Sequence, residues 1–281
     1  MTYFKLYHSP HGTLIQSSDS DLTKFTQATH WDDLINQDHL FEVCKNLFDK
    51  ATETDFNNHE ILPPVGQQEI WAAGVTYLRS KVARMEESKE SGGDTFYDKV
   101  YSAERPEIFY KGNALRAIGN GGQVRIRKDA VWNVPEPELT LFINKNKQIV
   151  GYTIGNDMSS RDIEGENPLY LPQAKVYDAS AGIGPGLLVP EKPLSHETVI
   201  DMKIFREKEQ VFQGDTTISQ MKRTHTELAE YLTRELSFPK GVFLMTGTCI
   251  VPDPPFTLQA NDRIEIKIEP IGTLIQTVAA Q

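Results

Sequence analysis

The sequence is short of the residues on which several kinds of protein depend. Cysteine occurs only twice in 281 residues, at Cys44 and Cys249, and no Cys-x-x-Cys pair is present. This excludes a disulfide framework and a cysteine zinc site, and it favours a reducing compartment. No apolar run approaches the roughly 20 residues that a membrane helix needs. The N-terminus lacks a basic segment followed by an apolar one, so we expect a cytoplasmic protein without a signal peptide.

Positive charge and histidine are also scarce. The chain has 29 Lys and Arg against 39 Asp and Glu, a formal net charge of −10, which disfavours nucleic acid or an anionic membrane as the main partner. Five of the seven histidines lie in the first 60 residues, which leaves His196 and His225 for the remainder. Chemistry based on clustered histidines is therefore disfavoured in the main part of the chain.

What is present is typical of a folded protein. Hydrophobic residues make up 39% and charged residues 24%, and the length fits one large domain or one large and one small. The first 60 residues are polar, and Ile61–Glu69, with two prolines and a glycine, has the composition of a connector. We predict a small N-terminal domain with its connector at 1–65 and a main domain at 66–281.

Hydrophobic periodicity predicts an α+β fold rich in β-structure, not an alternating βαβ chain. Helices are expected over Asp38–Lys50, Thr76–Ser91 and Thr226–Leu236. Strands are expected at 107–111, 123–126, 139–143, 148–155, 183–189, 198–205, 263–268 and 273–278.

Two acidic side chains next to prolines are the first candidates for chemistry. Glu136 and Glu138 are two residues apart, so an extended chain projects both carboxylates to the same side. Such a pair repels unless a cation or a proton lies between the two groups. Taken alone, the pair also fits a solvent-facing position on an edge strand.

A third carboxylate changes that balance. Asp157 follows a β-prone run, where functional groups are often placed, and it could complete a three-oxygen set with Glu136 and Glu138. Oxygen ligands without histidine or cysteine select Mg²⁺, Mn²⁺ or Ca²⁺ over Zn²⁺. For Arg161 and Asp162 the simpler interpretation is a structural salt bridge that fixes the loop.

Four segments together resemble the fumarylacetoacetate hydrolase family. They are PEIFYK (106–111), PEPEL (135–139), YTIGNDMSSRD (152–162) and TGT (246–248). The resemblance covers roughly residues 66–281. It implies a mixed β-roll-like core, a homodimer or homotetramer, and a divalent ion, Mg²⁺ with Mn²⁺ or Ca²⁺ as alternatives, bound by Glu136, Glu138 and Asp157.

One departure from this family bears on the reaction. Hydrolytic members carry Asn-Tyr-x-x-His-x-x-Glu near the start of the domain, and the His–Glu pair activates water. The matching stretch here begins Thr76-Tyr77, with Ser80 in place of histidine and Ala83 in place of glutamate. Neither residue can act as the base, so hydrolysis by the usual route of the family is disfavoured.

The stretches around TYLRSKVARMEES, YDKVYSAERPEIFYK and RDIEGENPLYLPQAKVYD resemble one subgroup, the 2-keto-3-deoxy-D-arabinonate dehydratases. This resemblance implies conversion of a 2-keto-3-deoxy pentonate to 2,5-dioxopentanoate, a dehydration that needs a metal, a base and an acid but no activated water. Lys175 is then the candidate base at C3 and Glu107 the candidate acid for the C4 hydroxyl. The candidate substrate contacts are Thr248, Ser80, Arg84 and Lys111.

Other functions stay open on the sequence alone. One is an acylpyruvate or fumarylpyruvate hydrolase with a different base. Another is a metal-independent dehydratase that forms a Schiff base through Lys175 or Lys111. A third, from a different class, is a non-catalytic protein stabilised by a metal.

Overall fold

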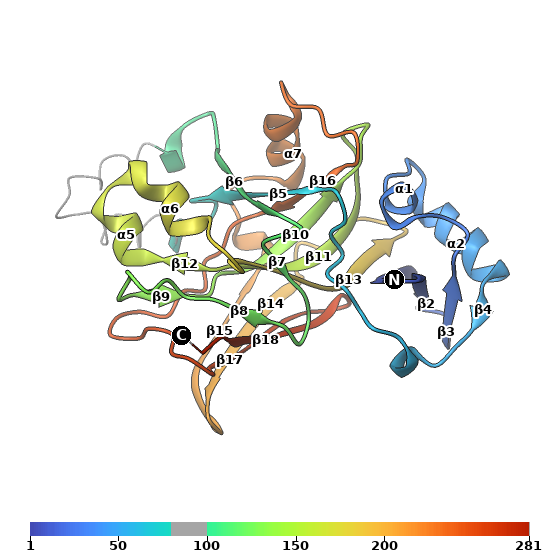
Figure 1. The fold of residues 1–281 in the computed structure, drawn as a ribbon. Helices are drawn as coiled ribbons and strands as arrows, with labels where there is room; N and C mark the ends of the chain where they lie inside the picture. Colours follow the sequence, from blue (N-terminus) through green and yellow to red (C-terminus); the bar gives the residue numbers. More distant parts are fainter. Residues whose placement is uncertain (80–99, 281) are drawn as a thin grey trace.

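The computed structural model describes residues 1–79 and 100–280, and two sheets dominate them (Figure 1). The larger sheet follows the order β4-β3-β2-β1-β13-β11-β10-β16-β5-β6, with β7 added beside β13. Its strands are β1 (Tyr3–Ser9), β2 (Gly12–Ser17), β3 (Ser20–Thr26), β4 (Thr52–Glu53), β5 (Glu69–Gly74), β6 (Glu107–Asn113), β7 (Ala117–Ile118), β10 (Pro137–Ile143), β11 (Ile149–Asp157), β13 (Ala181–Pro190) and β16 (Val242–Met245).

A second sheet packs against the first through a shared apolar core. Its order is β15-β14-β17-β18-β8. The strands are β8 (Gln123–Val124), β14 (Val199–Arg206), β15 (Glu209–Thr217), β17 (Arg263–Ile268) and β18 (Gly272–Val278). The core between the sheets contains Leu139 and Ile154 from the large sheet and Ile266 from the small one, all fully buried. Every residue of β10 is buried, which explains why this strand is apolar on both faces.

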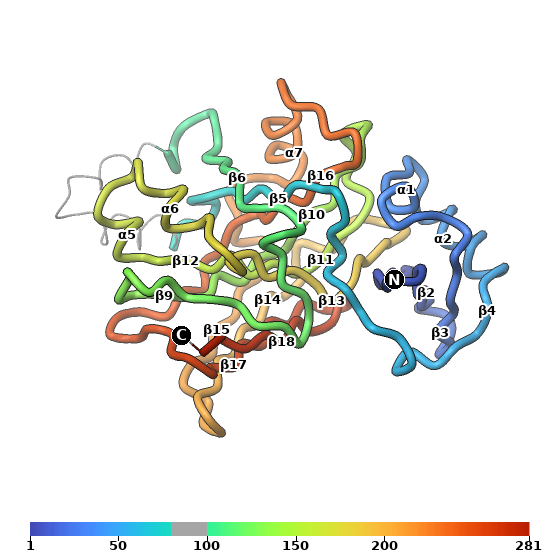
Figure 2. The backbone as a smooth tube through the Cα atoms, viewed as in Figure 1, coloured from blue at the N-terminus to red at the C-terminus, as the bar shows by residue number. Residues whose placement is uncertain are grey.

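Five α-helices among the described residues cover the sheets. They are α1 (Trp31–Ile35), α2 (Leu40–Lys50), α5 (Arg161–Glu166), α6 (Leu171–Lys175) and α7 (His225–Thr233). Helices α1 and α2 close a second apolar cluster on the face of the large sheet that is turned away from the small one. In Figure 2 the N-terminal strands and these helices lie at one end of the molecule, while α5 and α6 lie at the other. None of the helices in this part of the chain combines the length and apolarity that crossing a membrane requires.

Most of the predicted elements are confirmed. The helices expected over Asp38–Lys50 and Thr226–Leu236 correspond to α2 and α7, and each expected run of strand overlaps an observed strand. The helix expected over Thr76–Ser91 lies mostly outside the described residues. The prediction missed β1, β2 and β3, whose sequences were judged polar. It also missed β5, β15 and β16 and the short helices α1, α5 and α6.

The N-terminal strands belong to the large sheet. Strand β1 pairs antiparallel with β13, with Tyr3 opposite Pro190 and Leu6 opposite Leu187. The division of the chain at residue 65 therefore stays a prediction, since β1 to β4 extend the sheet that carries the acidic residues.

A partly buried histidine on α7, His225, predicts a pH dependence of stability. Burial lowers the pKa of His225 from 6.5 to about 4, and His196 adds to the effect. A folded state that excludes the charged form is fully stabilised above pH 6.5 and loses this contribution as the pH falls from 6.5 to 4, by about 3 kcal/mol. We expect the free energy of unfolding in urea to fall by about that much more for the wild type than for His225→Gln between pH 7 and 4. His11→Gln, at an exposed site, is the control, and parallel curves for wild type and His225→Gln would contradict the assignment.

Candidate metal and catalytic site

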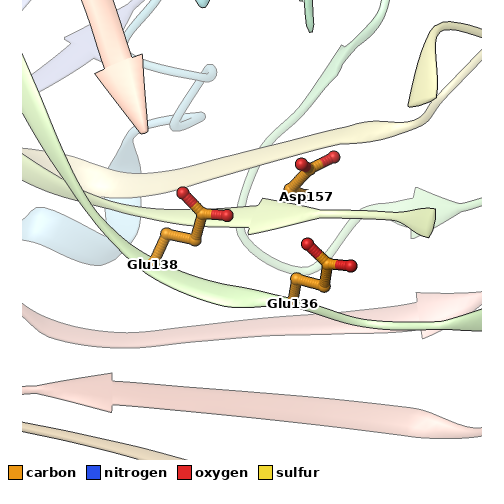
Figure 3. Close-up of side chains that lie close together, drawn as sticks. All are labelled: Glu136, Glu138 and Asp157. Atoms are coloured by element: carbon orange, nitrogen blue, oxygen red, sulfur yellow. The ribbon is translucent and has the colours of Figure 1, made fainter. Parts of the chain in front are cut away.

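Three carboxylates converge where β10 begins and β11 ends (Figure 3). The two strands are antiparallel, with Pro137 opposite Asn156, and the Asp157 amide donates to the Glu136 carbonyl at 2.9 Å. This register places Asp157 beside the Glu136–Glu138 pair, which shares one side of β10. One oxygen from each of the three carboxylates lies within 4.8 Å of the others. All three side chains are buried, with residue exposures of 3% or less.

Lys175, the last residue of α6, is ion-paired with two of these carboxylates. Its ammonium lies 2.7 Å from Glu136 Oε2 and 3.1 Å from Asp157 Oδ2, and the residue is fully buried. The short helix α6 brings this side chain to the end of β11 from a part of the chain that does not belong to either sheet. The structure thus brings the predicted base next to the predicted metal ligands.

Lys111 on β6 approaches the same carboxylates from the other side. Its ammonium lies 2.5 Å from Asp157 Oδ1 and donates to the carbonyl oxygens of Met158 (2.9 Å) and Lys175 (2.5 Å). These acceptors match the three donors of an ammonium group. Complete burial lowers the pKa of Lys111, and the neighbouring Asp157 opposes that effect. The structure therefore pairs the Lys111 ammonium with Asp157, while its predicted contact with the substrate stays a prediction.

Arg161 and Glu164 on α5 are the site residues that sequence reasoning missed. The Arg161 guanidinium lies 2.8 Å from Glu136 Oε1, and its Nε lies 3.7 Å from Glu164 Oε2. Arg161 turns into the site, while Asp162 accepts a hydrogen bond from the Val131 amide. The expected salt bridge between Arg161 and Asp162 stays a prediction. The sequence signal was the spacing of Arg161, which lies four residues after Asp157.

Glu138 differs from the other two carboxylates in its surroundings. It accepts a hydrogen bond of 2.5 Å from the Gly247 amide. Burial raises the pKa of Glu138 well above 4.5, and the nearby Asp157 and Glu136 charges raise it further. Gly247 has φ +96°, and a Cβ there would come within 2.0 Å of Thr76 Oγ1. Only glycine therefore lets this amide approach the carboxylate closely.

The carboxylates open into a small pocket. Its lining also includes Gly74, Val75 and Phe109, and the predicted substrate contact Thr248. Thr248 is 6% exposed, and its hydroxyl accepts a hydrogen bond from the Ile250 amide at 3.2 Å.

Glu107 lies beside Gly74, one of the residues that line this pocket. It is opposite Gly74 in the β5–β6 pairing, and its carboxyl occupies the space that a side chain at Gly74 would need. The remaining predicted contacts, Ser80 and Arg84, fall outside the described residues.

The donor set fits a hard divalent cation. Three buried carboxylates offer only oxygen, the ligand type of Mg²⁺, Mn²⁺ and Ca²⁺. Each carboxylate oxygen has two lone pairs, so oxygens bonded to lysine or arginine keep the capacity to bind a metal. The raised pKa of Glu138 points the same way, because a bound cation would relieve the repulsion that causes it.

Comparison with known proteins places this site in a family. The model of the fumarylacetoacetate (FAA) hydrolase C-terminal domain matches residues 70–279. A probable 2-keto-3-deoxyxylonate dehydratase of Haloferax volcanii is 43% identical over 267 residues, covering 94% of this chain and 91% of its own. A 2-dehydro-3-deoxy-D-arabinonate dehydratase of Saccharolobus solfataricus is 41% identical over 245 residues, covering 83% of this chain and 82% of its own.

A solved structure agrees with the sequence matches. It is that of 2-keto-3-deoxy-D-arabinonate dehydratase complexed with magnesium and 2,5-dioxopentanoate. It superposes with a TM-score of 0.81 at 30% identity and covers 100% of this chain and 99% of its own. The chain belongs to the fumarylacetoacetate hydrolase family.

Proposed function

We propose that the protein is a Mg²⁺-dependent dehydratase that converts a 2-keto-3-deoxy pentonate, of the 2-keto-3-deoxy-D-arabinonate type, to 2,5-dioxopentanoate. The observation that carries this proposal is the buried set of Glu136, Glu138 and Asp157 with the Lys175 ammonium 2.7 and 3.1 Å from two of them. The similarity to two dehydratases over more than four fifths of each chain supports the choice of reaction.

Glu136, Glu138 and Asp157 would hold the ion. When bound, Mg²⁺ polarises the ketone of a 2-keto acid and stabilises the enolate that forms when C3 loses a proton. These carboxylates lie at the start of β10 and the end of β11, and they contact Lys111, Arg161, Lys175 and the Gly247 amide. Their positions are therefore fixed before the ion binds. Gly247 contributes by orienting Glu138 through its amide.

Lys175 would accept the C3 proton. It is the only lysine among the residues that line the described pocket, and Glu136 and Asp157 hold its side chain next to the proposed metal ligands. Glu107 would protonate the departing C4 hydroxyl, which leaves as water and gives a C3–C4 double bond. Two further proton shifts move the unsaturation to C5 and yield the aldehyde.

The other predicted contacts divide into two groups. Thr248 lines the pocket and would bind the substrate through its hydroxyl, and Ser80 and Arg84 are proposed contacts on sequence grounds. The contacts of Lys111 favour a role in holding Asp157 and the end of α6, because its three donors already have acceptors within the protein. A homodimer or homotetramer in the cytoplasm completes the proposal.

The test compares two reactions of the purified protein with Mg²⁺. We expect 2-keto-3-deoxy-D-arabinonate to yield 2,5-dioxopentanoate and water, and acylpyruvates to remain uncleaved, because Ser80 and Ala83 replace the His–Glu pair. Chelation with excess EDTA should abolish the dehydration, and added Mg²⁺ should restore it.

Three results would contradict the proposal. Acylpyruvate hydrolysis without dehydration would favour a hydrolase. Full activity in EDTA, with substrate trapped on a lysine by borohydride, would favour the Schiff-base route. Binding of Mg²⁺ without turnover of any 2-keto-3-deoxy acid would favour a non-catalytic protein.

A further inference from the structure

A fourth carboxylate, Glu164 on α5, lies next to the cations that contact the metal-site carboxylates. It is 1% exposed and accepts a hydrogen bond from the Ser159 hydroxyl at 3.0 Å. Its oxygens lie 3.7 Å from Arg161 Nε and 4.0 Å from Lys175 Nζ. A buried carboxylate destabilises the folded state unless its charge is paired or hydrogen-bonded.

Glu164 and Glu136 share the same two cations. Glu136 contacts Arg161 at 2.8 Å and Lys175 at 2.7 Å, and Glu164 contacts both at the longer distances given above. The four side chains therefore form a buried ring in which negative and positive charges alternate. If Glu136 binds an ion, its carboxylate is shared between that ion and the two basic side chains. Glu164 then remains as a negative partner for Arg161 and Lys175.

Glu164 adds one carboxylate to a buried cluster that already holds Glu136, Glu138 and Asp157 together with the basic groups of Lys111, Arg161 and Lys175. Because little water reaches these groups to screen them, a negative charge at Glu164 favours a divalent cation and disfavours the carboxylate of a bound ligand.

We propose that Glu164 is a positioning residue that holds Arg161 and Lys175 and, through its negative charge, sets the balance between the affinity of the site for the divalent ion and its affinity for the monoanionic 2-keto acid. This inference rests on the proposed function. It assigns Glu164 no contact with the substrate and no part in proton transfer. Its role is to keep Arg161 and Lys175 in place and to raise the affinity of the site for the divalent ion.

The inference predicts opposite effects on the two ligands when the charge is removed. In Glu164→Gln the affinity for Mg²⁺ should fall about tenfold, because the ion then enters a site that is less negative by one unit. The affinity for pyruvate at saturating Mg²⁺ should rise about fivefold, because the anion then meets a more positive site. Isothermal titration calorimetry measures both constants without turnover.

Matched variants separate this effect from simple disruption. Glu166→Gln changes an exposed residue of the same helix and should leave both affinities within twofold. Glu164→Asp keeps the charge and should keep the Mg²⁺ affinity closer to the wild type than Glu164→Gln does. If Glu164→Gln fails to fold, Glu164→Met, an apolar side chain of similar length, is measured instead.

The outcomes are distinguishable. Wild type that binds Mg²⁺ and pyruvate, with opposite shifts in the neutral variant, supports the inference. Loss of both affinities in the neutral variant, or no change in either, overturns the inference and leaves the proposed function in place. Wild type that binds neither Mg²⁺ nor pyruvate overturns the proposed function and the inference with it.

Discussion

Replacing Glu138 by glutamine is expected to weaken Mg²⁺ binding at least a hundredfold while leaving the fold intact. The amide removes one of three charged ligands, and its carbonyl oxygen can still accept the hydrogen bond from the Gly247 amide. Glu138 is the best choice among the three, because Glu136 and Asp157 form ion pairs with buried cations that would be left unpaired. An unpaired buried charge lowers the free energy of unfolding by several kcal/mol. Such a loss of stability could not be separated from the loss of metal binding.

Stability provides a second measurement on the same variant. Because burial and the neighbouring carboxylates raise the pKa of Glu138, its ionised form costs stability that a neutral amide does not. Without metal, the melting temperature of Glu138→Gln should therefore equal or exceed that of the wild type. Mg²⁺ at a hundred times its dissociation constant should stabilise the wild type by about 2.7 kcal/mol and the variant hardly at all.

The control is a carboxylate far from the site. Glu235→Gln, at an exposed position after α7, should keep the Mg²⁺-dependent rise in melting temperature. A Glu138→Gln protein that still binds Mg²⁺ with wild-type affinity in calorimetry would remove this residue from the metal site and with it the three-carboxylate arrangement.

The part of the site that the sequence predicts is the part set by local geometry. Glu136 and Glu138 share a side because the side-chain period of a strand is two residues. Asp157 joins them because β10 and β11 form an antiparallel pair with a tight connection, so that the start of one strand meets the end of the next. Such a relation needs only two neighbouring strands and a turn, and both were visible in the hydrophobic pattern.

The cations depend on contacts between distant parts of the chain. Lys111 and the Lys175 carbonyl are 64 residues apart in sequence and meet only because β6 and α6 pack together. No local pattern distinguishes such a lysine from one on the surface, and the family resemblance was needed to select Lys175. Arg161 and Glu164 lie on a helix too short to show periodicity, which is why their inward direction was missed.

The N-terminal strands β1 and β2 were missed for a different reason. Strand β1 largely alternates partly exposed and buried residues, and β2 buries a block of three, Thr13–Ile15. The polar residues among them outweighed the apolar ones when the composition of this region was considered. The pairing of β1 with β13 places Phe4 and Leu6 in the apolar cluster of the large sheet. Membership of a sheet was therefore determined by a partner strand more than 170 residues away, which composition cannot reveal.

The largest effect on catalysis is expected at Lys175. Lys175→Met should lower the rate of dehydration at least a thousandfold, because methionine has a similar length but cannot accept a proton. Binding of Mg²⁺ should be retained or strengthened, since one positive charge beside Glu136 and Asp157 is removed. Loss of that ion pair should also destabilise the metal-free protein by about 3–5 kcal/mol, and Mg²⁺ should restore much of this loss.

A direct assay of the first step separates the base from the acid. In D₂O with Mg²⁺, the wild type should exchange the C3 protons of 2-oxobutyrate for deuterium, which proton NMR follows without any elimination. Lys175→Met should abolish this exchange. Glu107→Gln should keep the exchange and block the dehydration, because Glu107, beside Gly74, is assigned only to the departing hydroxyl. If Lys175→Met exchanged these protons at the wild-type rate, another group would be the base, and the assignment of Lys175 would fail even with the metal site intact.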